Sequence, residues 1–161
     1  MDMSENGLKF LADVQEGDIL HMYHDSAGYP TLGVGHLLLN EEKVSGYVNI
    51  NGSMVDWTQG ITEEQSLALL THDLKRFVAA VTGGVTVTLN QNQFDALVAF
   101  AFNIGDAGFL SSTVLKRVNA QEFDQVPAAM LRWDEAGGKV SQDMVACRNK
   151  EIKLWNGEET L

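Results

Sequence analysis

One helical segment near the middle of the chain is apolar on almost every side. Asn90 and Gln93 are placed to cap its N-terminus, and apolar residues then follow so densely that little polar face remains. A helix of this kind is stable in water only when other elements surround it, so the chain is expected to fold as a bundle around this segment. The apolar residues are Phe94, Leu97, Val98, Phe100, Ala101 and Phe102.

The surrounding helices have recognisable starts. Thr62 with Gln65 fits a capping box and opens a long helix. Ser112 and Ser141 are predicted to start two more helices. An N-terminal helix is expected with Ser4 or Asn6 as its cap. Its apolar positions are Leu8, Leu11, Ala12 and Val14, those of the long helix are Leu67, Leu70, Leu74 and Phe77, and Trp133 and Trp155 are predicted core residues.

The region between the first helix and Thr62 is predicted to contain β-strands. Residues 18–38 favour extended backbone around a turn at 25–28, which predicts a β-hairpin or small meander. Residues 40–60 leave two possibilities open: a hairpin over 48–55 around Asn51 and Gly52, or a short helix from Glu41 to Val44. The fold class is α+β and mostly helical.

Composition narrows the class of protein. A chain of 161 residues suits one domain, and a net charge of −11 disfavours nucleic-acid binding. The single Cys147 excludes an internal disulfide framework and a Cys-rich zinc site. The N-terminus lacks the features of a signal peptide and no apolar run is long enough to span a bilayer. We therefore expect a soluble protein made in the cytoplasm.

Two carboxylates stand out as candidates for chemistry. Glu16 is predicted at the end of the first helix, where the helix dipole disfavours a negative charge, so Glu16 should keep its proton more tightly. Asp25 is predicted at an exposed turn and should stay ionised. Two carboxyl groups in unlike environments are what a glycosidase needs. Structural uses of both residue types are commoner, so the pair alone leaves a structural role open.

Three histidines allow a second interpretation. His21, His24 and His36 lie close together in sequence, as in some metal sites, but no firm carboxylate or cysteine partner accompanies them. We therefore expect no metal and no cofactor. Cys147 is expected to be a small buried apolar residue rather than a nucleophile.

The spacing Glu-x8-Asp-x5-Thr followed by Gly-x-Gly-His resembles the T-even type of phage lysozymes, glycoside hydrolase family 24. Three further segments resemble the same family in the same order, so the resemblance extends from about Glu16 to Trp155. These segments are Ile61–Glu64, Leu89–Leu97 with Phe102–Gly105, and Leu131–Trp133 with Gly137–Lys139.

The resemblance implies a lysozyme-like fold in a single domain, residues 1–161. A small lobe of about 14–61 holds the β-hairpin, and a helical lobe of about 62–161 takes in the N-terminal helix, with the long helix between the lobes. It also implies catalytic roles for Glu16 as general acid, Asp25 as the second carboxylate and Thr31 as the hydroxyl that holds the attacking water. Such a water requires a wide carboxyl separation, and that geometry inverts the anomeric centre.

The resemblance implies further roles outside these three residues. His36 matches a structural ion-pair partner of Asp73, between the lobes, and Arg148 is a candidate partner for Glu16. Relatives often carry two or three consecutive Arg where only Arg148 remains here. Many phage lysozymes are also basic, whereas this chain is acidic. Substrate-binding positions are expected at Gly35, Leu37 and Asn103.

The function implied is that of a peptidoglycan muramidase, an endolysin, which cleaves the β-1,4 bond between N-acetylmuramic acid and N-acetylglucosamine. We expect a monomer that waits in the host cytoplasm until a holin lesion admits it to the cell wall, and that inserts in no membrane. Two alternatives use the same fold: a secreted antibacterial effector, and a non-catalytic peptidoglycan-binding or structural relative.

Overall fold

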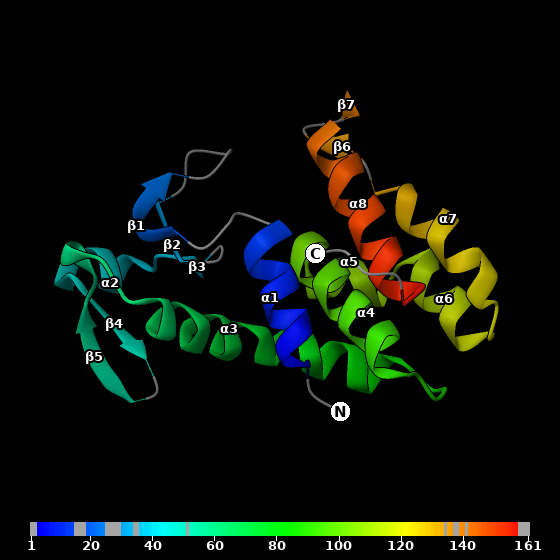
Figure 1. Cartoon of the computed structure of the whole chain (residues 1–161), viewed down its shortest axis with the longest axis horizontal. Coiled ribbons are helices and arrows are strands. Elements are labelled where there is room, and N and C mark those ends of the chain that lie inside the picture. Colours follow the sequence, from blue (N-terminus) through cyan, green and yellow to red (C-terminus); the bar gives the residue numbers. More distant parts are fainter. Residues whose placement is uncertain are drawn as a thin grey trace. The chain divides into compact units, whose positions relative to one another are not determined.

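The computed structural model describes residues 3–14, 19–24, 30–33, 36–50, 52–133, 135–136, 139–140 and 142–157 (Figure 1). They fall into two compact units, Leu8–Lys75, called the smaller unit below, and Met1–Gly7 with Arg76–Leu161, called the larger unit. The fold is α+β and mostly helical, as predicted. Within the described residues no helix is both long and apolar enough to cross a membrane.

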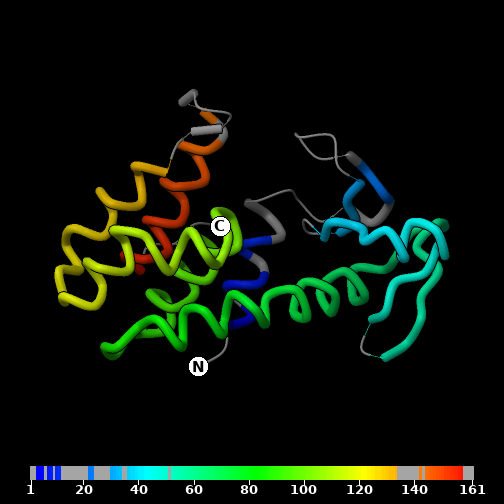
Figure 2. The backbone as a smooth tube through the Cα atoms, turned by 180° about the vertical axis from the view of Figure 1, so that it is seen from behind, coloured from blue at the N-terminus to red at the C-terminus, as the bar shows by residue number. Residues whose placement is uncertain are grey.

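α4, Gln91–Ile104, is the central helix of the larger unit and packs against α8 and α5. Every residue of α4 from Phe94 to Ala101 is buried, which confirms that this helix is a bundle centre. α8 lies along α4 and also packs on α7, while α6 and α7 lie side by side (Figures 1 and 2). The surrounding elements are α5 (Asp106–Leu110), α6 (Thr113–Asn119), α7 (Val126–Leu131) and α8 (Gln142–Trp155), with β6 (Glu135–Ala136), β7 (Lys139–Val140) and a 3₁₀ turn at Phe123–Gln125.

Aromatic rings fill the space beside α4. The Phe100 ring makes edge-to-face contacts with Trp133, at a centroid distance of 6.1 Å, and with Phe109, at 6.5 Å. Such pairs contribute about 0.5–1.5 kcal/mol beyond the burial of their area. Trp155 is buried against Phe123, as expected of a core residue, whereas Trp133 is only partly buried.

The smaller unit contains the β structure. β1 (Ile19–His24), β2 (Pro30–Gly33) and β3 (His36–Leu37) form an antiparallel meander with β2 in the centre. A second antiparallel pair follows, β4 (Tyr47–Ile50) with β5 (Ser53–Asp56), after the short helix α2 (Asn40–Ser45). Both possibilities for residues 40–60 are therefore present, one after the other. A 3₁₀ turn at Trp57–Gln59 completes the region.

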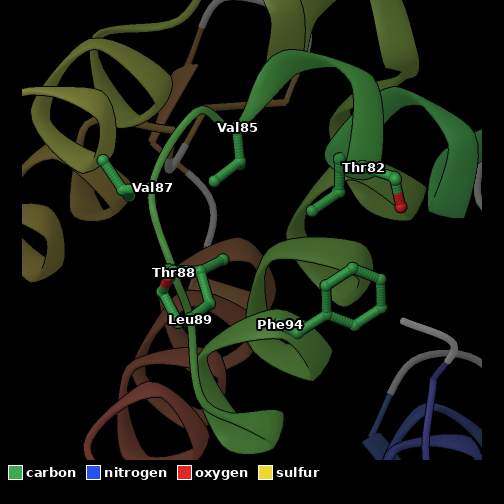
Figure 3. Close-up of a pocket in the computed structure, with 7 residues that line it drawn as sticks. Thr82, Val85, Val87, Thr88, Leu89 and Phe94 are labelled. Atoms are coloured by element: carbon green, nitrogen blue, oxygen red, sulfur yellow. The ribbon is translucent and has the colours of Figure 1, made fainter.

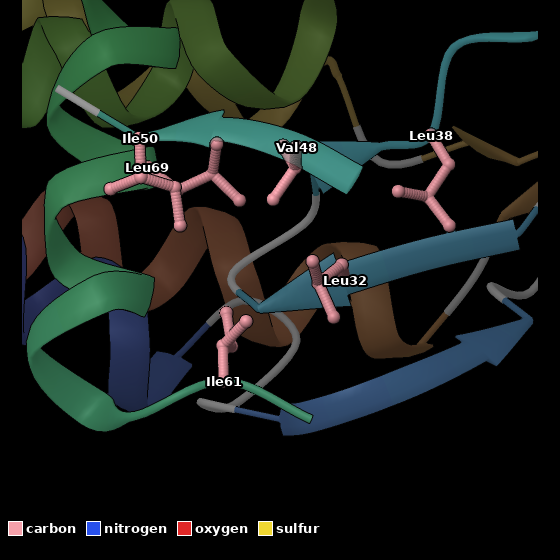
Figure 4. Packing of buried hydrophobic residues seen from close by; sticks show 6 residues of the cluster. All are labelled: Leu32, Leu38, Val48, Ile50, Ile61 and Leu69. Carbon is pink, nitrogen blue, oxygen red and sulfur yellow. The ribbon is translucent and has the colours of Figure 1, made fainter. Parts of the chain in front are cut away.

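The core of the smaller unit joins these strands to helix α3, Glu63–Gly84. Leu32 from β2 packs with residues of β4 and α3 (Figure 4). β4 alternates exposed and buried residues, so one face of its hairpin lies on this core and the other meets solvent. The cluster consists of Leu32, Leu38, Val48, Ile50, Ile61 and Leu69.

Several predicted helix starts are confirmed by hydrogen bonds. The Gln65 amide donates to Thr62 Oγ1, at 3.1 Å, and the Thr62 amide donates to Gln65 Oε1, at 2.9 Å. Asn90 and Gln93 form the same reciprocal pair at the start of α4. Ser112 caps α6 by accepting from the Leu115 amide, while Ser141 lies outside the described residues.

The first helix, α1 (Glu5–Val14), begins directly after Ser4, so Ser4 is its cap and Asn6 is not. The two units divide α1 after Gly7 and α3 after Lys75. The boundaries expected from the sequence lay at about 14 and 62, at the ends of these helices. These lobe boundaries stay a prediction.

The conformation of Gly33 suggests a stability test in the smaller unit. Gly33 has φ +62°, and a Cβ at this position would lie 2.9 Å from Ser66 Oγ. Gly33→Ala should therefore lose about 1–2 kcal/mol for the left-handed backbone and about 1–3 kcal/mol more for overpacking against buried Ser66. Chemical denaturation of the purified variant measures the loss.

Gly52→Ala is the matched control. Gly52 also has a positive φ, +87°, but nothing lies within 4 Å of its Cβ position. This variant should show only the backbone loss. Equal losses in the two variants would mean that Ser66 yields to the new methyl group without cost.

Candidate functional site

Thr31 is the described member of the predicted catalytic set. It lies on the central strand β2, opposite Tyr23 of β1 and Leu37 of β3, and its side chain is buried. Pairing on both sides fixes the backbone of β2, because each neighbouring strand supplies ladder hydrogen bonds. The Tyr23 hydroxyl also donates to the Gly33 carbonyl, at 3.3 Å, and so ties β1 to β2 a second time. Thr31 is therefore on a rigid element rather than on a loop.

The two carboxylates of the predicted set, Glu16 and Asp25, lie outside the described residues. Their positions in the sequence relative to described elements are informative. Glu16 follows the last residue of α1, Val14, by two positions, and Asp25 follows directly on the last residue of β1, His24. Gly35, predicted to bind substrate, also lies outside the described residues.

His36 is paired with two carboxylates in the structure. Its Nδ1 lies 2.7 Å from Asp73 Oδ2 on α3, and its Nε2 lies 3.0 Å from Glu42 Oε1 on α2. The contact with Asp73 was expected, but all three residues belong to the smaller unit. The two contacts therefore join strand β3 to helices α2 and α3 within one compact unit.

Sequence reasoning missed Glu42. The signal was available, because Glu42 is the N3 residue of a helix that begins four residues after His36, and its carboxylate accepts from the Leu39 amide as a helix start requires. Burial disfavours a charged imidazole and lowers the pKa of His36, but Asp73 and Glu42 together outweigh it and raise this pKa above the usual 6.5.

Arg148 is fully buried on α8 and forms a two-point ion pair with Glu151. The Arg148 Nε lies 2.6 Å from Glu151 Oε1, its Nη2 lies 2.8 Å from Oε2, and its Nη1 donates to the Trp133 carbonyl at 3.3 Å. The guanidinium also lies over the Phe100 ring, 5.3 Å from its centroid. Sequence reasoning missed Glu151, although its i,i+3 spacing from Arg148 was a signal. The contact predicted between Arg148 and Glu16 involves a residue outside the described part and stays a prediction.

The remaining predicted positions differ in exposure. Leu37 is 52% exposed on β3 and presents its side chain to solvent. Asn103, near the end of α4, has a buried Nδ2, and its side chain lies beside the Cys147 thiol. Cys147 is half-buried rather than fully buried, and burial together with the Glu151 carboxylate raises the pKa of its thiol. A raised thiol pKa fits the expectation that Cys147 is not a nucleophile.

A pocket in the larger unit does not fit hydrolytic chemistry. It lies between the end of α3 and the start of α4, and its volume is about 230 Å³ (Figure 3). Its lining contains no carboxyl, imidazole or thiol group. Apolar side chains of Val85, Leu89 and Phe94 surround it, with Thr82 and Thr88 as the polar members.

The His36 contacts predict how stability depends on pH. Because the folded pKa of His36 is raised, its pairing should stabilise the fold fully below pH 6.5 and fade as pH rises through the folded pKa. We expect the stability difference between wild type and His36→Gln to be largest near pH 5–6 and to shrink towards pH 9. Thermal unfolding across this range measures it.

His72→Gln is the control for this experiment, because His72 is exposed on α3 next to Asp73. The difference between wild type and this variant should stay small at every pH. A His36→Gln difference that grows with pH would contradict the pairing described above.

Comparison with known proteins gives one consistent result. The sequence profile of the phage lysozyme family matches residues 13–151. The chain is 40% identical to the endolysin of Salmonella phage P22 over 85% of its own length and 86% of that protein. It is 37% identical to the endolysin of Bacillus phage B103 over 79% of its own length, but spans only 43% of that longer protein.

Solved structures of phage lysozymes and a related muramidase domain have the same fold as this chain. A crystal structure of a P22 lysozyme mutant superposes with a TM-score of 0.80 at 36% identity, over 97% of this chain and 99% of that one. The muramidase domain of SpmX from Asticaccaulis excentricus gives a TM-score of 0.76 at 31% identity, over 96% and 97% of the two chains. Sequence profile, overall identity and fold all lead to the same conclusion: this chain belongs to the phage lysozyme family.

Proposed function

We propose that this chain is a peptidoglycan muramidase that hydrolyses the β-1,4 bond between N-acetylmuramic acid and N-acetylglucosamine, with inversion. The observation that carries the proposal is the family match over residues 13–151, which includes Glu16, Asp25 and Thr31. No metal or organic cofactor enters the reaction, because the two carboxyl groups supply the acid and the base.

The first half of the reaction is leaving-group departure. The protonated Glu16 carboxyl donates its proton to the glycosidic oxygen as the bond from that oxygen to the anomeric carbon of N-acetylmuramic acid breaks. The leaving sugar therefore departs as a neutral alcohol. Glu16 follows the C-terminal end of α1, where the helix dipole opposes a carboxylate charge and favours the protonated form.

The second half is attack by water. The Thr31 hydroxyl holds a water molecule on the opposite face of the sugar, and that water bonds to the anomeric carbon while its proton passes to the Asp25 carboxylate. The product is an N-acetylmuramic acid reducing end with inverted configuration. A buried threonine on a strand that is paired at both edges suits this role, because the paired backbone and the surrounding side chains hold its hydroxyl in one position.

Substrate contacts and delivery complete the proposal. Leu37 offers an exposed apolar side chain for a sugar face, and Gly35 and Asn103 are proposed to contact the glycan as well. The protein acts at the cell wall, as endolysins do. We further propose that it acts as a monomer and reaches the wall through a holin lesion.

Digestion of purified peptidoglycan tests the reaction. Mass spectrometry of the released muropeptides should find reducing N-acetylmuramic acid ends. Anhydro-muramic ends would indicate a transglycosylase and remove the role given to Asp25. Glu16→Gln should lower activity by about a hundredfold to ten-thousandfold, because general acid catalysis contributes about 10²–10⁴-fold.

Glu63→Gln is the matched control, because it removes one negative charge from an exposed site at the start of α3. This variant should keep full activity. Wild-type activity in Glu16→Gln would overturn the assignment of the acid, provided that both variants unfold at the same temperature as the wild type.

The net charge of −11 suggests a second test. Electrostatic repulsion between an acidic enzyme and an anionic wall slows approach, and salt screens it over a Debye length of about 10 Å at 0.1 M. The rate of lysis of whole envelopes should therefore rise from low to moderate ionic strength. A rate that falls steadily from the lowest salt upward would count against this electrostatic account.

A further inference from the structure

A buried carboxylate in the larger unit takes no part in the proposed reaction. Asp95 lies on α4, the helix that is otherwise apolar almost all round, and is fully buried. A buried carboxylate is unfavourable unless hydrogen bonds replace its water. Its hydrogen-bond partners are therefore informative about why it is there.

One of the two hydrogen-bond partners described for Asp95, Ser4, lies near the start of the chain. The Ser4 amide donates to Asp95 Oδ1, at 3.1 Å, and the Ser4 hydroxyl donates to Oδ2. Gln91 Nε2, one turn back on α4, donates to Oδ1 at 2.8 Å. Two of these three bonds join residues that are 91 positions apart, so Asp95 ties the start of α1 to the centre of the bundle.

Ser4 performs two tasks at once. Its Oγ accepts a hydrogen bond from the Gly7 amide, at 3.1 Å, which is the bond of a helix N-cap. The same oxygen carries the hydrogen that Asp95 accepts. The carboxylate therefore fixes the residue that caps α1, and its negative charge lies at the positive end of the α1 dipole.

Gly7 shows how closely the two helices approach at this point. A Cβ on Gly7 would lie 2.9 Å from Asp95 Cγ and 2.8 Å from Met3 Cγ. No larger residue fits there without displacing the carboxyl group or the chain start. Ser4, Gly7 and Asp95 together form what we call the α1 anchor.

We infer that Asp95 is a positioning residue for the catalytic acid, acting through the α1 anchor to set where α1 ends. This inference rests on the proposed function, in which Glu16 is the general acid. α1 spans ten residues, Glu5–Val14, and Glu16 follows two positions after it. A helix is stiff over this length, so a displacement of its start is transmitted to its end.

The expected loss of rate follows from how small a displacement of the catalytic acid the reaction tolerates. A catalytic group must lie within about 0.5 Å of its productive position, and a displacement of about 1 Å can reduce the rate a hundredfold. A loosened α1 should therefore reduce kcat. It should leave KM nearly unchanged, since none of the residues proposed to contact the glycan, Gly35, Leu37 and Asn103, lies at the start of α1.

Two substitutions at Asp95 separate hydrogen bonding from packing. Asp95→Leu removes every bond to Ser4 and also removes a buried charge, so the fold can remain stable. We expect its kcat on soluble peptidoglycan fragments to fall about tenfold or more, with KM within twofold. Asp95→Asn can still accept from the Ser4 amide and donate to Ser4 Oγ, so its kcat should stay within about threefold of wild type.

Ser4→Ala provides a variant that leaves the bundle centre untouched. It should lower kcat with KM unchanged, as Asp95→Leu does, and Ser4→Thr should restore kcat because it keeps the hydroxyl. Amide hydrogen exchange should become faster in α1 than in α4 in both low-activity variants, because the loosened helix opens locally.

Ser112→Ala is the matched control. Ser112 is another N-cap serine of the larger unit, more buried than Ser4, and it caps α6. Its loss should cost a similar amount of stability, about 0.5–2 kcal/mol, and leave kcat unchanged. A kcat for Asp95→Leu and Ser4→Ala that matches the Ser112→Ala value would overturn the inference and make the anchor purely structural.

The Glu16→Gln variant distinguishes this failure from failure of the proposed function. If Glu16→Gln is inactive and Asp95→Leu keeps full kcat, only the positioning role is wrong. If Glu16→Gln remains active, the acid is another residue and the positioning role falls with the proposed function.

Discussion

The burial of α4 on every side governs the larger unit. A helix without a solvent face needs a neighbour along each side, and α5 and α8 supply two of them. The same burial removes water from any polar group on or near the helix, so each such group needs a partner from within the protein. Asp95 finds one in the N-cap of α1, and Arg148, lying over the Phe100 ring, finds one in Glu151. The packing that buries the bundle centre therefore also requires that these polar groups be paired with one another.

The smaller unit is held together by an apolar cluster and by the contacts of His36 with two carboxylates. Its apolar core contains a cluster of six buried residues, and partly buried contacts of a histidine with two carboxylates join further elements of the unit. His36 joins β3 to both α2 and α3, and Trp57 Nε1 donates to the Glu42 carbonyl at 2.8 Å. Glu42 therefore connects to the rest of the unit by its side chain and by its backbone. Since the imidazole bonds depend on protonation, the stability of this unit is tied to pH in a way that the aromatic packing of the larger unit is not.

Local signals in the sequence predicted the features that short-range physics determines. Capping boxes at Thr62 and Asn90 involve residues three positions apart, and both are present. Residues 40–60 contained two signals, for a helix at 41–44 and for a hairpin at 48–55, and the structure has both. The partners Glu42 and Glu151 were missed although they lie close in sequence, because charged residues near one another are common and only the fold shows which ones meet. Ser4 and Asp95 are 91 positions apart, and no local pattern reveals that pairing.

The roles of Glu16, Asp25 and Thr31 came from a family resemblance, since the residue types alone left a structural role open.

The buried pair of Arg148 with Glu151 is expected to fix the positions of these two side chains more than it stabilises the fold. Replacing a buried ion pair by apolar residues of similar volume is often neutral or even stabilising, so the pair of Arg148 with Glu151 is a poor choice if the fold needs only to be stable. What an apolar contact cannot supply is direction, because dispersion forces tolerate small sliding movements whereas a two-point hydrogen bond does not. Inverting hydrolysis requires an acid and a water on opposite faces of one sugar, with little tolerance for sliding. A fold that has to place such groups gains more from directional contacts than it loses by burying them.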